Sequence, residues 1–346
     1  MDKFDPCGIE VSAQELIVAL SRDERAERLR SFPTTAEGHA AICRFLGSGS
    51  QRVRVALEST GLYGLDLAYA LHRDARIEVM VANPRAARHF ASALMQRSKN
   101  DRLDAGVLRE FAARMPFQAW VAPSAHCFAL CAVTRRLETL TEQCTAEKNR
   151  QHAASLSVAF PAAVRRDLQR SVRSIQRAIA RLTREAQRIV QADPLLNCSY
   201  HLLLTAKGIG PTSALRLLAE TALLSEDLDV RQWVAYAGLD PREYQSGSSV
   251  HKKVRISKTG NRHLRRALYM PALVAVRHEP HLRAFYQHLL AQGKCKMQAL
   301  VAAMRKLLHA VYAMLKHRQP YDGAKLYRLI ENLPASSSAT CSAEAA

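Results

Sequence analysis

The first third of the chain alternates between short strand-like runs and amphipathic stretches. Residues 8–11, 16–20 and 29–32 predict three β-strands, and the apolar, β-branched runs at 52–58 and 77–82 predict two more. Residues 35–46, 61–72, 85–93 and 101–114 predict helices, with Thr34 or Thr35 as the N-cap of the first. Three strands followed by alternating helices and strands predict an α/β layer with a mixed sheet.

Residues 124–193 have the spacing of two long helices. Apolar side chains recur three and four residues apart, which predicts a coiled coil or helical hairpin with a break around Phe160-Pro161. The seam residues are Leu130, Val133, Leu137, Leu140 and Cys144 in the first helix and Leu168, Val172, Ile175, Ile179, Leu182, Ala186 and Ile189 in the second.

Arginines dominate the outer face of the second long helix, where only Asp167 and Glu185 balance them. A solvated coiled-coil face usually mixes both signs of charge. The pattern therefore favours contact with nucleic acid over a plain solvated surface. The arginines are Arg165, Arg166, Arg170, Arg173, Arg177, Arg181, Arg184 and Arg188, of which we assign Arg173, Arg177, Arg181 and Arg184 to nucleic-acid binding.

From residue 199 onward the pattern predicts helices, interrupted by one Gly-rich motif at 204–215. The end of the chain, from residue 333, is small and polar and is expected to be disordered. We therefore predict four parts: an α/β domain at 1–120, a helical hairpin at 121–198, a mainly helical domain at 199–332 and a tail at 333–346.

The net charge of +19 is concentrated late in the chain. Residues 1–120 carry 17 Lys and Arg against 15 Asp and Glu, residues 121–200 carry 12 against 6, and residues 201–346 carry 21 against 10. This distribution favours a nucleic-acid partner. The eight cysteines form no CxxC pair, and neither a signal peptide nor a membrane-length apolar run is apparent. We expect a cytoplasmic protein with reduced thiols.

The segment 244–270 combines small hydroxyl residues with a dense run of cations. A serine beside such a phosphate-binding surface is either a phosphate ligand or a nucleophile. Only His251 lies near enough in sequence to be a base, so residue chemistry leaves both roles open for Ser246. The segment begins Tyr244-Gln-Ser246-Gly247-Ser248-Ser249, and its cations are Lys252, Lys253, Arg255, Lys258, Arg262, Arg265 and Arg266.

Four carboxylates lie at predicted strand ends and on one helical face. Glu10 and Glu58 end strands, and Asp101 and Asp104 lie three residues apart at a helix start. Hard divalent cations prefer oxygen ligands, so the four together predict a metal site for phosphoryl transfer. The alternative is that each acid acts locally, with Asp101 capping its helix and Glu58 meeting a surface arginine.

The motif Lys207-Gly208-Ile209-Gly210-Pro211 predicts a helix-hairpin-helix element. A Gly-x-Gly turn between two helices opens backbone N–H groups to a phosphate. A tight turn that only packs inside its own domain is the alternative.

These motifs, taken in order, resemble one family. Gly8-Ile9-Glu10, then Leu57-Glu58-Ser-Thr-Gly61, then Lys99-Asn-Asp101-Arg-Leu-Asp104 resemble the RuvC-like domain of DEDD insertion-sequence transposases. That family includes the Piv/MooV DNA invertases and the recombinases guided by a bridge RNA. Residues 208–270 independently resemble the family's C-terminal transposase domain, through Gly208-Ile-Gly210, the run at 233–242, the serine segment and residues 257–270.

The resemblance implies an RNase H-like, RuvC-type fold for the first domain, with Mg²⁺, for which Mn²⁺ can substitute, held by Glu10, Glu58, Asp101 and Asp104. It implies that Ser246 attacks DNA to form a covalent phosphoserine, with Ser248 and Ser249 as less favoured candidates. It also implies a composite site within a homodimer or homotetramer, with donor DNA, target DNA and a guide RNA as partners in the bacterial nucleoid.

One residue departs from the family's pattern. The first acid is normally Asp, and here it is Glu10, one methylene longer; the usual following Lys is absent from residues 11–15. A longer carboxylate can still reach a metal through another rotamer, but the site is then shifted or holds the ion more weakly. Two other functions also stay open. One is a RuvC-like, metal-dependent nuclease in which Ser246 only grips phosphate. The other is a non-catalytic nucleic-acid-binding factor.

Overall fold

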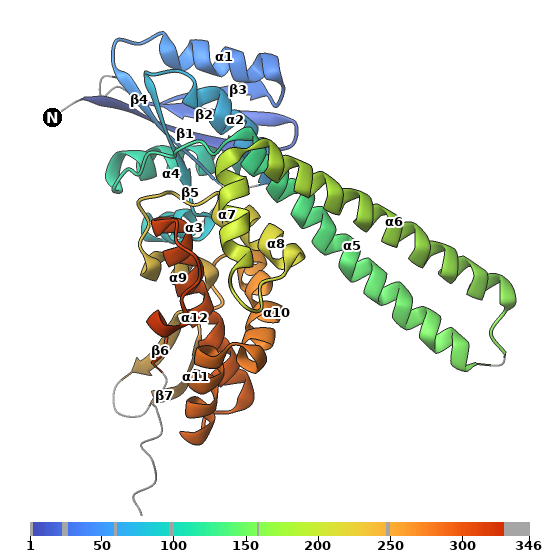
Figure 1. The fold of residues 1–346 in the computed structure, drawn as a ribbon. Helices are drawn as coiled ribbons and strands as arrows, with labels where there is room; N and C mark the ends of the chain where they lie inside the picture. Colours follow the sequence, from blue (N-terminus) through green and yellow to red (C-terminus); the bar gives the residue numbers. More distant parts are fainter. Residues whose placement is uncertain are drawn as a thin grey trace, which may run out of the picture. The chain divides into compact units, whose positions relative to one another are not determined.

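The computed structural model describes residues 3–22, 27–58, 61–96, 98, 100–157, 159–246 and 250–328. Contacts divide the chain into two compact units, Met1–Ala122 and Pro123–Ala346 (Figure 1). Each unit has its own hydrophobic core. The boundaries predicted at 120, 198 and 332 stay predictions. No helix in the described ranges is long and apolar enough to cross a membrane.

The first unit contains a five-stranded mixed sheet with the strand order β3-β2-β1-β4-β5. Antiparallel pairing joins β1 to β2 and β2 to β3, whereas β4 is parallel to β1 and β5 is parallel to β4. The mixed sheet predicted from the sequence is confirmed. The strands are β1 (Phe4–Val11), β2 (Glu15–Leu20), β3 (Arg28–Pro33), β4 (Arg52–Glu58) and β5 (Ile77–Ala82).

Side chains alternate between the two faces of this sheet, and different helices cover each face. Cys7 and Ile9 belong to the core that α1 and α2 share with the sheet. On the opposite face Gly8 and Ala56 contact α4, and α3 packs beside α4. The helices are α1 (Ala36–Gly47), α2 (Gly61–His72), α3 (Pro84–Ala93) and α4 (Asp101–Arg114), and Thr35 caps the first.

Gly8 lets α4 lie directly on β1. A Cβ atom at this position would come 2.1 Å from the carbonyl oxygen of Ala105 and 2.2 Å from the backbone nitrogen of Arg109. Both are backbone atoms, so the helix cannot yield by a side-chain rotation. The glycine in the first acidic motif therefore sets the distance between the strand of Glu10 and the helix of the two aspartates.

We expect Gly8→Ala to destabilise the first unit by about 3 kcal/mol, because overpacking against backbone forces α4 off the sheet. Urea unfolding in a Trp233→Phe background measures this, since Trp120 is then the only tryptophan. Gly106→Ala is the matched control: it lies on α4, and the atoms nearest to its Cβ would belong to the Glu27 side chain, the first at 3.4 Å. Equal stabilities of the two variants would contradict the assigned packing.

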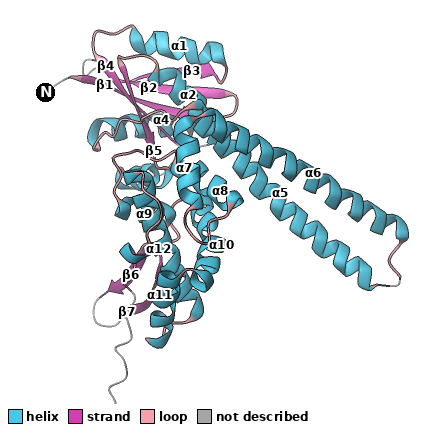
Figure 2. Cartoon of the chain, viewed as in Figure 1, coloured by secondary structure: helices cyan, strands magenta, loops and turns pink. Residues whose placement is uncertain are grey.

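The second unit begins with the two long helices that the apolar spacing predicts (Figure 2). They are α5 (Ala125–Leu156) and α6 (Ala162–Ala192), which pack along each other as a helical hairpin. In the predicted seam, Leu130, Leu137 and Leu140 of α5 and Val172 and Ala186 of α6 are buried.

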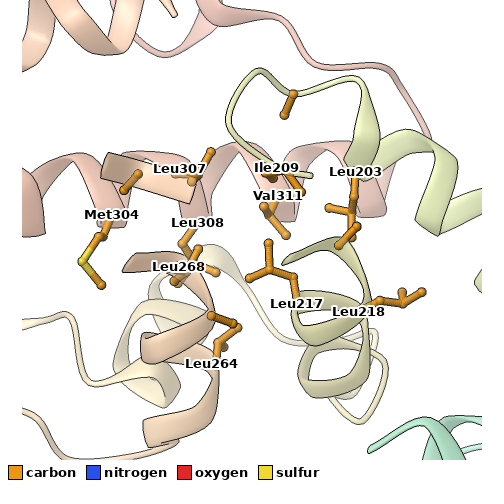
Figure 3. Packing of buried hydrophobic residues seen from close by; sticks show 14 of the residues in the cluster. Leu203, Ile209, Leu217, Leu218, Leu264, Leu268, Met304, Leu307, Leu308 and Val311 are labelled. Atoms are coloured by element: carbon orange, nitrogen blue, oxygen red, sulfur yellow. The ribbon is translucent and has the colours of Figure 1, made fainter. Parts of the chain in front are cut away.

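The remaining helices of the second unit pack around one core (Figure 3). Leu203, Ile209 and Leu217 come from the α7–α8 region, and they meet Leu268 of α10 and Leu307 of α12. This core holds the start of α10 in place, and α10 carries part of the basic run. The helices are α7 (Pro194–Leu204), α8 (Pro211–Thr221), α9 (Val230–Ala237), α10 (Arg262–His278), α11 (Pro280–Ala291) and α12 (Lys296–His317), followed by the short η1 (Gly323–Lys325).

The expectation that the chain is helical from residue 199 onward is wrong at one place. An antiparallel β-hairpin, β6 (Pro241–Ser246) and β7 (Val250–Ile256), lies between α9 and α10. Val250, Val254 and Ile256 stand at every second or fourth position, which favours a strand. The cations between them conceal this alternation in a pattern analysis, and the hairpin carries the serine segment.

Candidate active site and nucleic-acid interface

Glu10 and Glu58 lie next to each other in the sheet. Their strands are parallel neighbours, and the two glutamates directly follow the paired residues Ile9 and Leu57. Strand alternation puts both on the face of Gly8, which α4 covers. The topology therefore brings the first two predicted acids to the carboxyl edge of β1 and β4, where both are half-buried.

Asp101 and Asp104 occupy the first turn of α4, the helix on that same face. Asn100 caps this helix by accepting a hydrogen bond from the backbone N–H of Leu103 at 2.8 Å. The capping role that was the local alternative for Asp101 thus belongs to Asn100. Asp101 is exposed and Asp104 half-buried.

The four carboxylates have the right chemistry for a hard divalent cation. In the ranges that the structure describes, however, no group of three or more His, Cys, Asp or Glu side chains could hold a metal ion. The backbone thus brings two acids together on neighbouring strands and two on the covering helix, but among the residues described the carboxylates are not close enough to one another to coordinate an ion.

Ser246 is the last residue of β6, and its backbone pairs with Val250 of β7. His251, the candidate base, pairs with Gln245. Gly247, Ser248 and Ser249 lie outside the described residues. The favoured serine is therefore at the turn end of a β-hairpin.

The predicted cations of this segment fall into groups. Arg255, Lys258 and Arg262 are exposed, whereas Arg265 donates to the carbonyl oxygen of Ala237 at 2.8 Å. Arg266 forms an ion pair with Glu138 at 3.0 Å and another with Glu142 of the same long helix. Lys252 and Lys253 lie on β7, and their side chains are outside the described part. The exposed three are the stronger candidates for phosphate contacts.

Four of the arginines predicted to bind nucleic acid follow one exposed face of α6. Arg173, Arg177, Arg181 and Arg184 are all exposed and lie three or four residues apart, so they share one side of the helix. The seam that packs on α5 lies on another side of α6, which leaves this row open along the hairpin.

The two glycines of the α7–α8 turn differ in what surrounds them. Gly208 has a φ of +107°, and a Cβ there would lie 2.6 Å from the carbonyl oxygen of Pro271, so a tight packed turn accounts for it. At Gly210 a Cβ atom would meet nothing within 4 Å, and this residue precedes α8 without a side-chain cap. The exposed helix start at Gly210 is the part of the motif where a phosphate can approach.

Sequence reasoning missed Glu220, which joins three helices near the basic segment. This carboxylate is 3% exposed and accepts two hydrogen bonds from Arg135 of α5, at 3.0 and 3.1 Å. It also accepts one from the side-chain amide of Asn261 at 2.6 Å, and Asn261 caps the start of α10. The signal was a single charge inside the apolar run Leu217-Leu-Ala-Glu220, which indicates a buried, paired acid.

Burial tends to raise the pKa of Glu220, but the hydrogen bonds from Arg135 and Asn261 outweigh it and hold the pKa below the ordinary 4.5. A carboxyl whose folded pKa is lowered stabilises the protein above its unfolded pKa and loses that effect as pH falls through the folded value. Glu220 thus contributes stability near neutral pH, and this contribution declines below about pH 4.5.

We expect Glu220→Gln to destabilise the second unit by about 2 kcal/mol at pH 7, less than for a fully buried pair because Arg135 reaches solvent. The deficit should shrink as the pH falls from 4.5, the ordinary pKa, toward the lower pKa that Glu220 has in the folded protein. Urea unfolding followed by Trp233 in a Trp120→Phe background measures it. Glu142→Gln, at an exposed partner of Arg266, is the control, and an equal loss there would contradict the role of Glu220.

A carboxylate-lined sheet edge and a separate basic unit are features of a protein that acts on nucleic acid. Two family models match the chain: a DEDD model of IS110 elements, described as a transposase, over residues 7–161, and the "Transposase IS116/IS110/IS902 family" over residues 200–287. The chain belongs to this family of insertion-sequence transposases. Membership puts it among the enzymes that bind and rearrange DNA.

Individual relatives agree with the family models. The pilin gene-inverting protein of Moraxella lacunata is 30% identical over 272 residues, which cover 78% of this chain and 82% of that protein. Its namesake in Moraxella bovis matches to the same extent. A 43.6 kDa protein of the insertion element IS110 in Streptomyces coelicolor is 30% identical over 121 residues, 35% of this chain and 30% of that protein.

Proposed function

We propose that this transposase cuts and rejoins DNA through a covalent phosphoserine at Ser246. The observation that carries the proposal is the position of Ser246, at the turn end of a β-hairpin whose second strand leads into exposed cations. A hydroxyl there can reach a phosphate that those cations hold. The pilin gene-inverting relatives, which by their name invert a gene, support a reaction that joins strands as well as cutting them.

The proposed step conserves the phosphodiester bond energy. The hydroxyl oxygen of Ser246 forms a bond to phosphorus, the bond from phosphorus to one sugar oxygen breaks, and the hydroxyl proton passes to that departing oxygen. Attack by the hydroxyl of another strand end reverses the step and releases the serine. No external energy source is needed, because one ester replaces another at each stage.

The first unit is proposed to be a RuvC-like domain that holds a divalent cation, Mg²⁺ with Mn²⁺ as a substitute. The strand order, with three antiparallel strands followed by two parallel ones, supports this fold. Glu10, Glu58, Asp101 and Asp104 would hold the ion, and their side chains must turn inward to do so, which Glu and Asp rotamers permit. When bound, the ion acts as a Lewis acid on phosphate oxygens.

The serine and the acids belong to different units of the chain, and we propose that they meet between subunits of a homodimer or homotetramer. In such a composite site a metal held by another subunit can activate Ser246, so His251 is not needed as a base. A composite site also predicts that chains with Ser246→Ala and chains with Asp104→Asn, each strongly impaired alone, regain activity when mixed. Absence of any recovery in mixed oligomers would contradict a shared site.

We propose that donor DNA, target DNA and a bridge RNA occupy the basic surfaces. The exposed row on α6 and the exposed cations after the hairpin offer two separate surfaces, more than one duplex contact requires. The start of α8 at Gly210 adds an anion site with backbone donors. A guide RNA that pairs with both DNA partners would account for this excess of positive charge.

We expect the triple variant Arg255→Gln, Lys258→Gln, Arg262→Gln to flatten the slope of log affinity against log salt by roughly 2 to 3, since each lost phosphate contact removes about 0.7–0.9. Fluorescence anisotropy with a labelled DNA measures the slope. Arg266→Gln is the matched control, because Arg266 is already paired with Glu138 and Glu142. An unchanged slope in the triple variant would mean that this surface faces away from DNA.

Trapping protein on DNA tests the proposal against its rivals. A serine recombinase leaves protein attached to DNA after denaturation, in Mg²⁺ or Mn²⁺. A RuvC-like nuclease releases free ends with no attached protein, and a non-catalytic factor produces neither. Free ends without adduct would replace the proposed function by the nuclease.

A further inference from the structure

The segment between β5 and α4 is basic and contains no acid. Residues 83–100 hold five Lys, Arg and His side chains and not one Asp or Glu. β5 ends at Ala82, which pairs with Glu58, and α4 begins at Asp101. A cationic segment thus leaves the sheet beside one predicted metal ligand and ends beside another. The five are Arg85, Arg88, His89, Arg97 and Lys99, of which Arg97 and Lys99 lie outside the described residues.

Helix α3 forms the first part of this segment and is firmly anchored. Asn83 accepts a hydrogen bond from the backbone N–H of Arg85 at 2.9 Å, and Pro84 occupies the first turn. Ala87 is buried, and the Phe90 ring packs edge-on against Phe111 of α4 with ring centroids 5.3 Å apart. One face of α3 is therefore fixed to the helix that carries Asp101 and Asp104.

The opposite face of α3 is exposed and basic. Arg85, Arg88 and His89 are all exposed, and the Nε of Arg85 donates to the Nε2 of His89 at 3.3 Å. In the part of the chain that the structure describes, neither Arg88 nor His89 forms an ion pair with a carboxylate. A basic face on a segment with no acid of its own differs from an ordinary solvated helix, in which both signs alternate.

The carboxylate edge near this face creates an electrostatic problem for a bound DNA strand. Four carboxylates at one sheet edge repel a phosphodiester strand, and a single divalent ion offsets only two of their charges. The strand therefore needs cations close to the acids. The first third of the chain has almost no positive excess, and α3, which follows directly on the strand paired with Glu58, presents three of that unit's exposed basic side chains.

We propose that the exposed face of α3, with Arg85, Arg88 and His89, binds the phosphate backbone of the DNA strand that crosses the carboxylate edge. It would hold the phosphates next to the one that reacts, so these are binding residues and not catalytic ones. The inference rests on the proposed function, because it names the substrate strand of that same edge.

The test is DNA binding by the full-length Ser246→Ala protein in EDTA, with a fluorescein-labelled single strand as the probe. We expect Arg85→Gln/Arg88→Gln to weaken binding roughly 25-fold at about 0.1 M salt and to flatten the salt slope by about 1.4, the value for two contacts to a single strand. Arg85→Lys/Arg88→Lys, which keeps both charges, should restore the slope.

The matched control is Arg73→Gln/Arg76→Gln, which removes the same charge from exposed residues just before β5, at the amino edge of the sheet. Equal slopes for this control and the α3 variant would overturn the proposal, and so would a change seen only with an RNA probe. Urea unfolding of each variant separates lost binding from lost folding.

The result of this test does not depend on the proposed function, because neither metal nor Ser246 takes part in the binding that it measures. If the α3 variant loses single-strand binding while no protein ever attaches to DNA, the basic face stands and the phosphoserine does not. If the α3 substitutions are made in the chain that keeps Ser246 and the adduct forms with full yield and rate, the phosphoserine is supported and the proposed role of α3 is wrong.

Discussion

Replacing Ser246 with alanine is expected to eliminate covalent attachment to DNA and to lower the recombination rate by roughly 10⁶-fold, the order observed when a serine enzyme loses its nucleophile. The alanine side chain has no oxygen that can bond to phosphorus, and no other group of β6 or β7 is positioned by the family pattern to replace it. DNA binding should not change, because the cations that follow the hairpin are untouched. Denaturing gels of labelled DNA, before and after protease, measure the adduct.

Ser248→Ala and Ser249→Ala are the matched controls for this prediction. They make the same chemical change within three residues of Ser246 and should leave the adduct at more than about a tenth of its normal yield, the cost of losing an auxiliary phosphate contact. An adduct of normal yield in Ser246→Ala would move the nucleophile elsewhere. Loss in Ser248→Ala alone would assign the role to that serine.

Replacing Asp104 with asparagine is expected to slow strand cleavage about a thousandfold, equivalent to about 4 kcal/mol of transition-state stabilisation, because a neutral amide holds a divalent cation poorly. Asparagine keeps the size and helical position of Asp104, so α4 should fold normally. DNA binding should be retained or strengthened, since one negative charge leaves the carboxylate edge. Single-turnover cleavage assays across Mg²⁺ and Mn²⁺ concentrations measure the effect.

Asp66→Asn serves as the control, because Asp66 is an exposed acid on α2, which covers the other face of the sheet. It should cleave DNA at the normal rate. Undiminished cleavage in Asp104→Asn would remove the metal role from α4. Glu10→Asp adds a second comparison: if the longer side chain of Glu10 displaces the ion, the aspartate variant should cleave faster than the parent chain.

The first unit shows which strands the pattern of apolar residues can predict. Strands such as β4 and β5 combine β-branched runs with clear turns, so the pattern predicts both with the bounds that the structure has. The apolar pattern does not predict the hairpin of β6 and β7, because Lys and Arg stand between the apolar residues of β7, including Val254 and Ile256. Periodicity detects alternation of apolar and polar residues, and the run of cations in β7 hides it.

The sequence predicts only part of the candidate site. The order of the four acids indicates a common edge, and the pairing of β1 with β4 agrees for Glu10 and Glu58. That Asn100, and not Asp101, caps α4 depends on local backbone geometry. The division of the cations into exposed ones and ones paired with α5, as for Arg266, depends on contacts between residues more than a hundred positions apart. Spacing along the chain does not encode such contacts.

Identifying the residue that carries the DNA strand tests the proposed phosphoserine at Ser246 without an intermediate step. The adduct formed by the full-length protein in Mg²⁺ is digested with nuclease and protease, and mass spectrometry locates the remaining nucleotide. We expect a nucleotide phosphate on Ser246. A nucleotide on any other residue, or cleaved DNA with no modified peptide, would contradict it.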